Sequence, residues 1–407
     1  MFRLNFVHAG RLRVAAASLA VAAMTALAGC NATGVSGGGA MAPGPDARST
    51  GPITGETIGS GPVRVALLLP LSATGNAGQL AQNMRNAAEL ALRDFNSAGI
   101  TILLKDDRGT VEGAQAAASA AINEGAELIL GPLFARSVSG VGAVARGSRV
   151  PVIAFSTDTA SAAPGVYLLS FLPQSDVDRI VSYAASRGKR SFAALLPQNA
   201  YGTVVEAALQ RAVANAGGRV MGIERYALDK VSMQAAATNV AALIKSGTID
   251  AVFMPDAGDA APFLAQIIAS QGIRPGQIAY LGSGQWDDAR ISGESNLAGA
   301  WFPAPEAAGF ASFSRRYQAA YGATPIRASS LAYDATSLAA GLASRFGDNR
   351  FAAQTLTNPN GFIGIDGAFR LLQNGLNQRG LAVYQVGNGT TTIVDPAPKS
   401  FTRTPGM

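Results

Sequence analysis

The side chains that most often carry out enzyme chemistry are almost absent from this sequence. The 407 residues include one histidine, His8, and one cysteine, Cys30. Without further imidazoles or thiols, the rest of the chain cannot form a Ser-His-Asp triad, a cysteine nucleophile, a cysteine–histidine zinc site or a disulfide. Acid–base catalysis would have to use Asp, Glu, Lys or Tyr alone. We therefore predict a protein that is not an enzyme and that holds no metal and no cofactor.

Cys30 has a separate predicted role. Met1–Arg13 is cationic and Val14–Leu27 is largely apolar; as a helix this run would extend about 21 Å, short of the roughly 30 Å hydrocarbon core. The pattern is typical of a signal peptide, here residues 1–29. Leu27-Ala28-Gly29-Cys30 is similar to the bacterial lipobox, which implies lipidation of Cys30 and a periplasm-facing lipoprotein. Asn31, in place of Asp, favours the outer membrane. The alternative is a chance cysteine in a core.

Charge and composition bound the possible partners. The chain has 32 Lys and Arg against 26 Asp and Glu, and three of the cations lie in the predicted signal peptide. The remaining cations are scattered, without the clustered, aromatic-interleaved stripe that nucleic-acid binding requires. Residues 30–62 are rich in Gly and Pro, which favours a flexible tether behind the anchor. The membrane is therefore expected to be contacted only through the lipid, and nucleic acid not at all.

From Val63 the sequence alternates short β-rich runs with Ala-rich helical runs, typical of parallel sheets covered by helices on both faces. The alternation of strand and helix patterns begins again after Phe171-Leu172-Pro173, which predicts two α/β lobes. The expected division is 63–171 with 304–358 for lobe one, 172–303 with 359–395 for lobe two, and 396–407 as a tail. Ala368–Leu372 and Leu381–Val386 are expected to form a hairpin across Asn374-Gly375.

Ligands of open parallel sheets bind at the carboxyl ends of the strands. The polar and aromatic residues expected there, as candidate ligand-binding residues, are Ser72, Ser137, Ser156, Thr157, Asp158, Tyr201, Asp256 and Trp286. Ser137 and Ser156 could equally cap helices or turns. Asp256 and Asp259 could hold an ammonium, with Asp259 favoured as a helix cap, and Tyr201 could stack on a ligand or rest at the hinge. Asp106-Asp107-Arg108 is interpreted as a structural ion pair.

Several of these loops, in order, resemble the type 1 periplasmic binding proteins of the leucine/isoleucine/valine-binding kind. The matching segments are Pro70-Leu71-Ser72, Asp106, Gly131-Pro132, Val150–Ile153, Tyr201-Gly202 and Leu331–Ala335. The resemblance implies two lobes, each a parallel sheet flanked by helices, joined by crossing hinge strands. It also implies an amino acid or similar small polar ligand between the lobes, and an ABC permease as partner.

The sequences of some segments are more similar to the lipoprotein branch called penicillin-binding protein activators. These are Ala66–Leu71, Leu130–Leu133, Gly188–Ser191 and the tail from Gly375 through Val383. That resemblance implies regulation of a peptidoglycan synthase by protein contact, although the large helical N-terminal domain of the best-known activators is missing. The two functions remain alternatives at this point.

Overall fold

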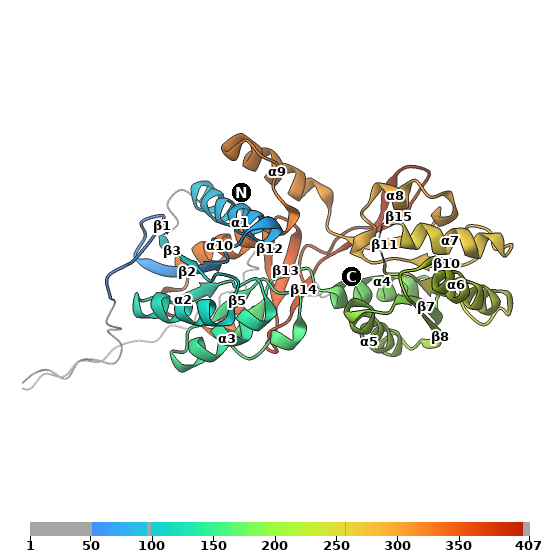
Figure 1. The fold of residues 1–407 in the computed structure, drawn as a ribbon, viewed down its shortest axis with the longest axis horizontal. Helices are drawn as coiled ribbons and strands as arrows, with labels where there is room; N and C mark the ends of the chain where they lie inside the picture. The colour runs from blue at the N-terminus through green and yellow to red at the C-terminus, as the bar shows by residue number, and fades with distance from the viewer. Residues whose placement is uncertain (1–50, 96–98, 257, 402–407) are drawn as a thin grey trace, which may run out of the picture.

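The structure is a computed structural model, and it describes residues 51–95, 99–256 and 258–401. The predicted signal peptide, Cys30 and the first part of the tether lie outside these residues. Figure 1 shows two lobes at opposite ends of the molecule, joined by extended segments. The chain crosses between the lobes three times, at 169–172, 305–306 and 380–381. The extensively packed pairs of elements in the described residues each lie within one lobe, so the lobes are linked mainly by these crossings.

Lobe one is built on a six-stranded sheet. Its strands, in the order β1-β3-β2-β4-β5-β6, are β1 (Thr57–Ile58), β3 (Ile100–Asp106), β2 (Val63–Leu69), β4 (Leu128–Leu130), β5 (Val152–Ala154) and β6 (Val166–Leu168). All neighbouring pairs are parallel except β1 with β3. Strand β2 is buried on both faces, since Leu67 and Leu69 join one core cluster while Ala66 and Leu68 join another.

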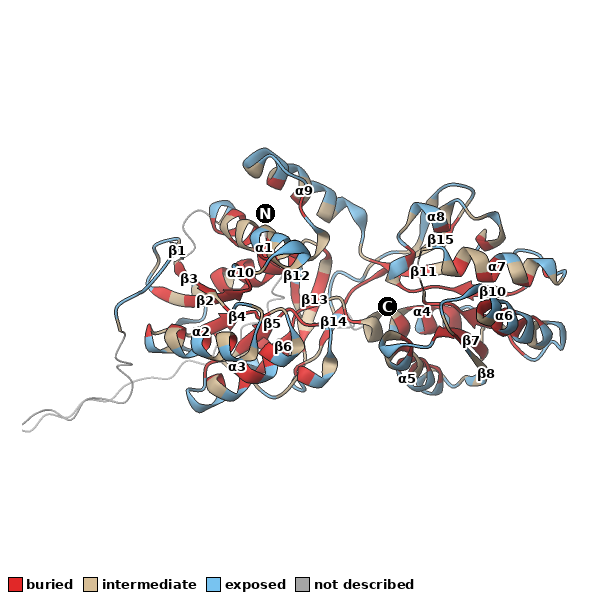
Figure 2. Ribbon diagram, viewed as in Figure 1, coloured by how far each residue is buried: buried red, intermediate tan, exposed pale blue. Residues whose placement is uncertain are grey.

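Helices cover both faces of this sheet (Figure 2). The helices of this lobe are α1 (Gly75–Asp94), α2 (Val111–Asn123), α3 (Ala135–Gly147), α9 (Ala307–Tyr321), α10 (Ser330–Ala343) and α11 (Ala353–Leu356), of which α9 packs on α1 and projects from the lobe. Helix α10 is almost wholly buried and packs along α1. The sequence had indicated all of these helices except the four-residue α11, and it had not indicated the three-residue strand β6.

Lobe two is built on a seven-stranded sheet. Its strands, in the order β16-β15-β11-β10-β9-β7-β8, are β16 (Thr391–Asp395), β15 (Ala382–Val386), β11 (Trp301–Ala304), β10 (Ala279–Leu281), β9 (Ala251–Phe253), β7 (Ser191–Pro197) and β8 (Arg219–Tyr226). The five strands β7 to β11 are parallel. Strands β15 and β16 extend this sheet at one edge by antiparallel pairing. The helices are α4 (Pro173–Ser186), α5 (Ala200–Asn215), α6 (Lys230–Lys245), α7 (Ala260–Ser270) and α8 (Ala289–Ser292).

Residues 359–380 lie in a different lobe from the one expected. They form a three-stranded antiparallel sheet, β12 (Phe362–Gly364), β13 (Gly367–Leu371) and β14 (Asn377–Arg379). Phe362, Phe369 and Leu371 belong to the core cluster of lobe one. The turn at Asn374-Gly375 therefore joins β13 to β14, and the expected hairpin partner, residues 381–386, instead pairs with β11 as β15. The Asn374-Gly375 pair correctly indicated a turn between two paired strands. It did not indicate which of the following segments would pair with β13.

Residues 51–62, expected to be tether, pack on lobe one, and we call them the N-terminal strap. Strand β1 pairs with β3, and the Gly51 N–H donates to the Asn123 carbonyl at 2.9 Å. Beneath the strap, Lys105 and Glu124 form a buried ion pair at 2.7 Å. The Lys105 ammonium also donates to the Thr54 carbonyl at 2.6 Å. A buried ion pair needs such extra hydrogen bonds, so these residues hold the strap in place.

Candidate functional site

In lobe one, the loop after β2 carries Ser72, whose side chain is exposed. Its backbone N–H lies 3.3 Å from Asp106 Oδ1, and the Arg108 backbone N–H donates to the same oxygen at 2.9 Å. Burial opposes ionisation of Asp106, but hydrogen bonds from Ser72 and Arg108 outweigh it and lower the pKa of Asp106. The expected side-chain ion pair of this loop is not among the ion pairs of the described residues: Arg108 is held by its backbone.

The loop after β5 presents the consecutive candidates Ser156, Thr157 and Asp158. The Ser156 hydroxyl is buried and accepts the Asp158 N–H at 3.1 Å, which is the turn-capping role that the sequence left open. Asp158 caps the short 3-10 turn Thr159–Ser161 by accepting the Ala160 N–H at 3.0 Å. The side chains of Thr157 and Asp158 are exposed. Two of the three candidates are thus open to a ligand.

Ser137 lies inside lobe one rather than on its loop surface. It is the third residue of α3, is 1% exposed, and donates to the Thr110 carbonyl at 3.2 Å. This bond fastens α3 to the loop before α2, so the side chain has a structural role. A serine near a helix start faces inward or outward depending on the helix's rotation, which sequence spacing alone did not fix.

Phe134 is a lobe-one residue that the list of candidates missed. It precedes α3, directly after Gly131-Pro132-Leu133, and its side chain is 41% exposed. Its ring lies beside Gly109, where an added Cβ would come within 3.2 Å of Cε2. Gly131 has φ +93°, and a Cβ there would lie 2.2 Å from the Leu68 carbonyl oxygen. The glycine lets the loop turn tightly over β2, which sets Phe134 beside the loop after β3.

In lobe two, Tyr201 lies in the first turn of α5, directly after the turn from β7. An added Cβ on Gly202 would lie 1.9 Å from the Pro197 carbonyl oxygen, so this close turn needs glycine. The Tyr201 hydroxyl lies 3.2 Å from Ser283 Oγ and 3.3 Å from the Pro255 carbonyl. Ser283, fully buried, donates to the same carbonyl at 2.7 Å. Burial, together with the charges of Asp176 and Asp256, raises the pKa of Tyr201.

The other two candidates of lobe two are joined beneath the same loops. The Trp286 indole N–H donates to the Asp256 carbonyl at 3.0 Å, and the Tyr226 hydroxyl donates to Asp256 Oδ2 at 3.0 Å. Burial and the Asp256 carboxylate raise the pKa of Tyr226. Trp286 was expected at the ligand surface, but its side chain is fully buried in the core of lobe two. It supports the Asp256 loop from below.

Asp259 takes the expected position before α7 without the expected bond. It is the residue that precedes the helix, but its side chain makes no capping hydrogen bond. The carboxylate is instead 92% exposed and lies 3.5 Å from Arg290. Its backbone is already in the helical region, with φ −87° and ψ −10°, whereas a capping side chain usually requires an extended residue.

The first turn of α4 touches loops of both lobes. Asp176, in this turn, accepts the Gly284 N–H at 2.9 Å, next to Ser283 after β10. Gln174 donates to Thr159 Oγ1 of lobe one at 3.4 Å. Burial raises the pKa of Asp176 to about 7, against the opposing effects of the Gly284 N–H and the charge of Arg379. The sequence missed Asp176 because an acid in a first helical turn also suits the helix dipole.

A buried charged group lies beside the crossings in lobe one. Arg379 is 5% exposed, donates from Nε to the Ser170 carbonyl at 3.1 Å, and stacks 4.5 Å from the Phe171 ring. Asp366 is fully buried and accepts from Arg327 at 2.8 Å. Burial, with the charge of Asp366, raises the pKa of Asp334 to about 7. These groups surround the hinge rather than the exposed loops.

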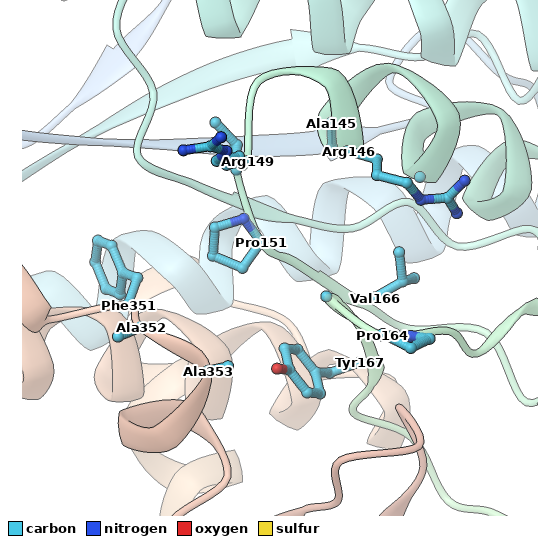
Figure 3. Close-up of a pocket in the computed structure, with 13 residues that line it drawn as sticks. Ala145, Arg146, Arg149, Pro151, Pro164, Val166, Tyr167, Phe351, Ala352 and Ala353 are labelled. Atoms are coloured by element: carbon cyan, nitrogen blue, oxygen red, sulfur yellow. The ribbon is translucent and has the colours of Figure 1, made fainter. Parts of the chain in front are cut away.

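A cavity in lobe one lies away from these loops. It has a volume of about 310 Å³ and is lined at the amino ends of β5 and β6 by Pro151, Val166 and Tyr167, with Phe351 opposite. In Figure 3 the side chains of Arg146 and Arg149 extend away from each other at its border. None of the predicted site residues lines it. It occupies the edge of the lobe-one sheet opposite the candidate loops.

Within residues 51–401, so far as they are described, no group of three or more acidic, Cys or His side chains could hold a metal ion. In the same part of the chain, none of the helices combines the length and the apolar character needed to cross a membrane. The candidate site offers loop N–H groups, hydroxyls, carboxylates and aromatic rings. Such groups suit a small polar ligand.

Comparisons with known proteins identify the family and the fold. Residues 62–391 match the family model described as periplasmic binding protein. Among curated proteins, none matches this sequence. Similar solved structures include a branched-chain amino acid ABC transporter periplasmic ligand-binding protein from Burkholderia xenovorans, at 15% identity and TM-score 0.62, covering 83% of this chain and 96% of that one.

Two further structures were solved with ligands. An ABC transporter substrate-binding protein from Desulfitobacterium hafniense, in complex with Leu, is 15% identical with TM-score 0.58, covering 82% and 99% of the two chains. A solute-binding protein from R. palustris, in complex with benzoate, is 19% identical with TM-score 0.54, covering 84% and 98%. At such identities these structures show a shared two-lobed α/β fold. Because the family model spans most of its length, this chain belongs to the periplasmic binding protein family.

Proposed function

We propose that this protein is a lipid-anchored solute-binding protein of the periplasm that binds an amino acid or a similar small acid between its lobes and delivers it to an ABC permease. Its family is one of substrate-binding proteins rather than enzymes. Ligand binding would close the lobes about the three crossings, and the closed form is the one a permease would recognise.

The observation that carries this proposal is the position of the first turn of α4. Gln174 in that turn reaches Thr159 after β5 of lobe one, while Asp176 reaches Gly284 after β10 of lobe two. The carboxyl ends of both sheets therefore meet at one place, which is where open α/β sheets bind ligands. Loops from two bodies with few other contacts can enclose a small molecule by rotation about the crossings.

The groups on the two sides fit different parts of such a ligand. In lobe one, Ser72 and Thr157 offer hydroxyls at loop ends, which suit a carboxylate, and exposed Phe134 offers an apolar surface. In lobe two, Asp256 offers a carboxylate that suits an ammonium. The two ligand-bound similar structures hold Leu and benzoate, both of which have a carboxylate on an apolar body. We therefore expect the ligand to have that chemistry.

The test is a titration of the full chain with the common amino acids, benzoate, short peptides and muropeptide fragments, followed by melting temperature and tryptophan fluorescence. A ligand present at 100 times its dissociation constant adds about 2.7 kcal/mol of stability, which a melting curve detects. A saturable shift with one amino acid or organic acid is the expected result. Silence across the whole panel would refute binding of a small solute.

A matched pair of variants locates the binding. Thr157→Trp would place a large side chain in the exposed loop after β5 and should abolish the shift. Thr238→Trp, at an exposed position of α6, is the control and should bind as the wild type does. A ligand that binds both variants equally well does not bind at the β5 loop.

The lipid anchor has its own experiment. Changing Cys30 to Ser should move the protein from the membrane fraction to the soluble periplasmic fraction, and mass spectrometry should find acyl chains only on the wild type. In a density gradient, the wild-type protein is expected with the outer membrane. Acyl chains found on the C30S protein would disprove lipidation of this residue.

A second candidate function is regulation of a peptidoglycan synthase by contact. The observation that favours it is that candidate side chains of lobe two already form hydrogen bonds inside that lobe. Tyr201, Ser283 and Trp286 each bond to a neighbouring loop. A site whose polar groups are already bonded to each other suits a cleft that no longer binds a solute. Capture of a penicillin-binding protein by the full chain, with no melting shift from any small ligand, would favour this function over import.

A further inference from the structure

Arg379 is a buried cation whose hydrogen bonds are incomplete. Only Nε has a partner, the Ser170 carbonyl, whereas Nη1 and Nη2 are buried without a hydrogen-bond partner among the described residues. The guanidinium is held from one side by the Phe171 ring at 4.5 Å. Leaving buried donors unsatisfied costs free energy, so the structure is stabilised wherever an acceptor can reach them.

Two acceptors that belong to the other lobe lie in the first turn of α4. Gln174 Oε1 is buried and also lacks a partner, and Asp176 uses Oδ2 for the Gly284 N–H. Asp176 and Arg379 interact electrostatically, but no hydrogen bond or ion pair joins them in this arrangement of the lobes. Arg379 ends β14, the last strand of lobe one, and Asp176 lies in the first turn of α4, the first helix of lobe two. The two side chains therefore belong to elements on opposite sides of the crossings.

Asp334 is a competing carboxylate, but hinge motion cannot change its distance from Arg379. Asp334 and Arg379 both belong to lobe one, and Asp334 is fixed by the Ile365 N–H at 2.7 Å. An added Cβ on Gly364 would lie 2.3 Å from Asp334 Oδ2, so this oxygen is packed against the backbone. Asp176 is different because it moves with lobe two whenever the lobes rotate.

We propose that Asp176 and Arg379, which we call the hinge pair, form an ion pair when the lobes close, and that this ion pair stabilises the closed state. The inference builds on the proposed function, because closing is what would enclose a ligand. In the closed state Arg379 gains the acceptor it lacks, and Asp176 gains a cation beside its carboxylate. Both changes favour closure, so these residues position the lobes and do not themselves need to touch the ligand.

The hinge pair makes closure depend on pH. In this arrangement of the lobes the pKa of Asp176 is raised to about 7, and a guanidinium partner would lower it in the closed one. The closed state therefore gains stability as pH rises toward 7, and the gain levels off above that pH. Each unit of that pKa difference raises the closed-to-open ratio roughly tenfold. The other charged or titratable groups facing the pair are Asp334 of α10, Asp366 before β13, Arg327 before α10 and Tyr201 of α5.

The test measures the distance between the lobes with no ligand present. Spin labels on Ser139→Cys of α3 and Gln210→Cys of α5, both exposed, are placed in the full chain carrying Cys30→Ser. Electron paramagnetic resonance then gives the label separation at pH 5 and pH 8. The expected result is a larger closed population at pH 8 in the parent protein and no pH response in Asp176→Asn or Arg379→Gln.

Asp334→Asn is the matched control, since it removes a carboxylate of similarly raised pKa from lobe one only and should keep the response. Asp176→Glu retains an ionisable group and should also keep it. The same separation at both pH values in the parent protein overturns the inference whatever the variants do, as does an unchanged response in Asp176→Asn. Closure with pH combined with silence in the ligand titration would refute the proposed function and leave the hinge pair intact.

Discussion

In lobe one, the side chains of Ser72, Thr157 and Phe134 are exposed at the ends of strands, whereas in lobe two Tyr201 and Trp286 are bonded into neighbouring loops. The two lobes share the parallel-sheet plan, so the difference lies in the loops and not in the sheets. Groups that already have partners must lose them before they can bind a ligand. We therefore expect ligand recognition to begin on lobe one and lobe two to complete it.

The largest expected effect is on the free energy of unfolding, and it is tested with one aromatic residue from each lobe. Trp286→Ala should destabilise the protein by about 3–5 kcal/mol, because it empties a fully buried site. Phe134→Ala, at an exposed position in the corresponding kind of loop, should change stability by only about 0.5 kcal/mol. Urea unfolding of both variants measures the difference. Equal losses would mean that the loops of lobe one are as well packed as those of lobe two.

A smaller effect is expected from two serines. Ser283→Ala should cost about 1–3 kcal/mol, since it leaves the buried Pro255 carbonyl and the Tyr201 hydroxyl short of a partner. Ser156→Ala removes a single acceptor for the Asp158 N–H and should cost about 0.5–1.5 kcal/mol. The same unfolding measurement ranks them. A reversed order would contradict the view that lobe two is the more tightly bonded side.

The last comparison concerns pH, where the lobes are alike. Burial raises the pKa of Asp176 in lobe two and Asp334 in lobe one to about 7, above the unfolded value of about 3.9. The unfolded chain therefore ionises first, and the native state loses stability as pH rises from about 4 to about 7. Asp176→Asn and Asp334→Asn should each gain melting temperature relative to wild type between pH 5 and pH 8. A constant difference across that range would show that these acids titrate normally.

Much of the fold follows from local patterns in the sequence. The buried runs Val63–Leu69 and Ser191–Leu196 predicted two strands correctly, and the renewed alternation after Pro173 predicted the second lobe. Pairing across long distances was harder. Residues 359–380 carry no local sign of whether they pack on lobe one or lobe two, because Phe362 and Phe369 would suit either core. Strands β1 and β6 were not predicted, although other strands of three residues, such as β10, were.

The candidate site was predictable to the level of loops but not of side chains. The loops holding Ser156, Tyr201 and Asp256 do lie at strand ends as expected. Whether a side chain is exposed depends on the rotation of the element that holds it, and this turned Ser137 and Trp286 inward. Asp176 and Arg379 went unnoticed because the crossings bring together residues about two hundred positions apart.

The N-terminal strap also decides which part of the molecule can carry a mechanical load. Whatever precedes Gly51 is attached at the Asn123 end of α2, on the side of lobe one where its parallel strands begin. A pull from that direction would pass into lobe one through β1 and the Lys105–Glu124 pair and would not stretch any of the three crossings. Lobe two would then be able to rotate relative to lobe one while a force acts on the N-terminal strap.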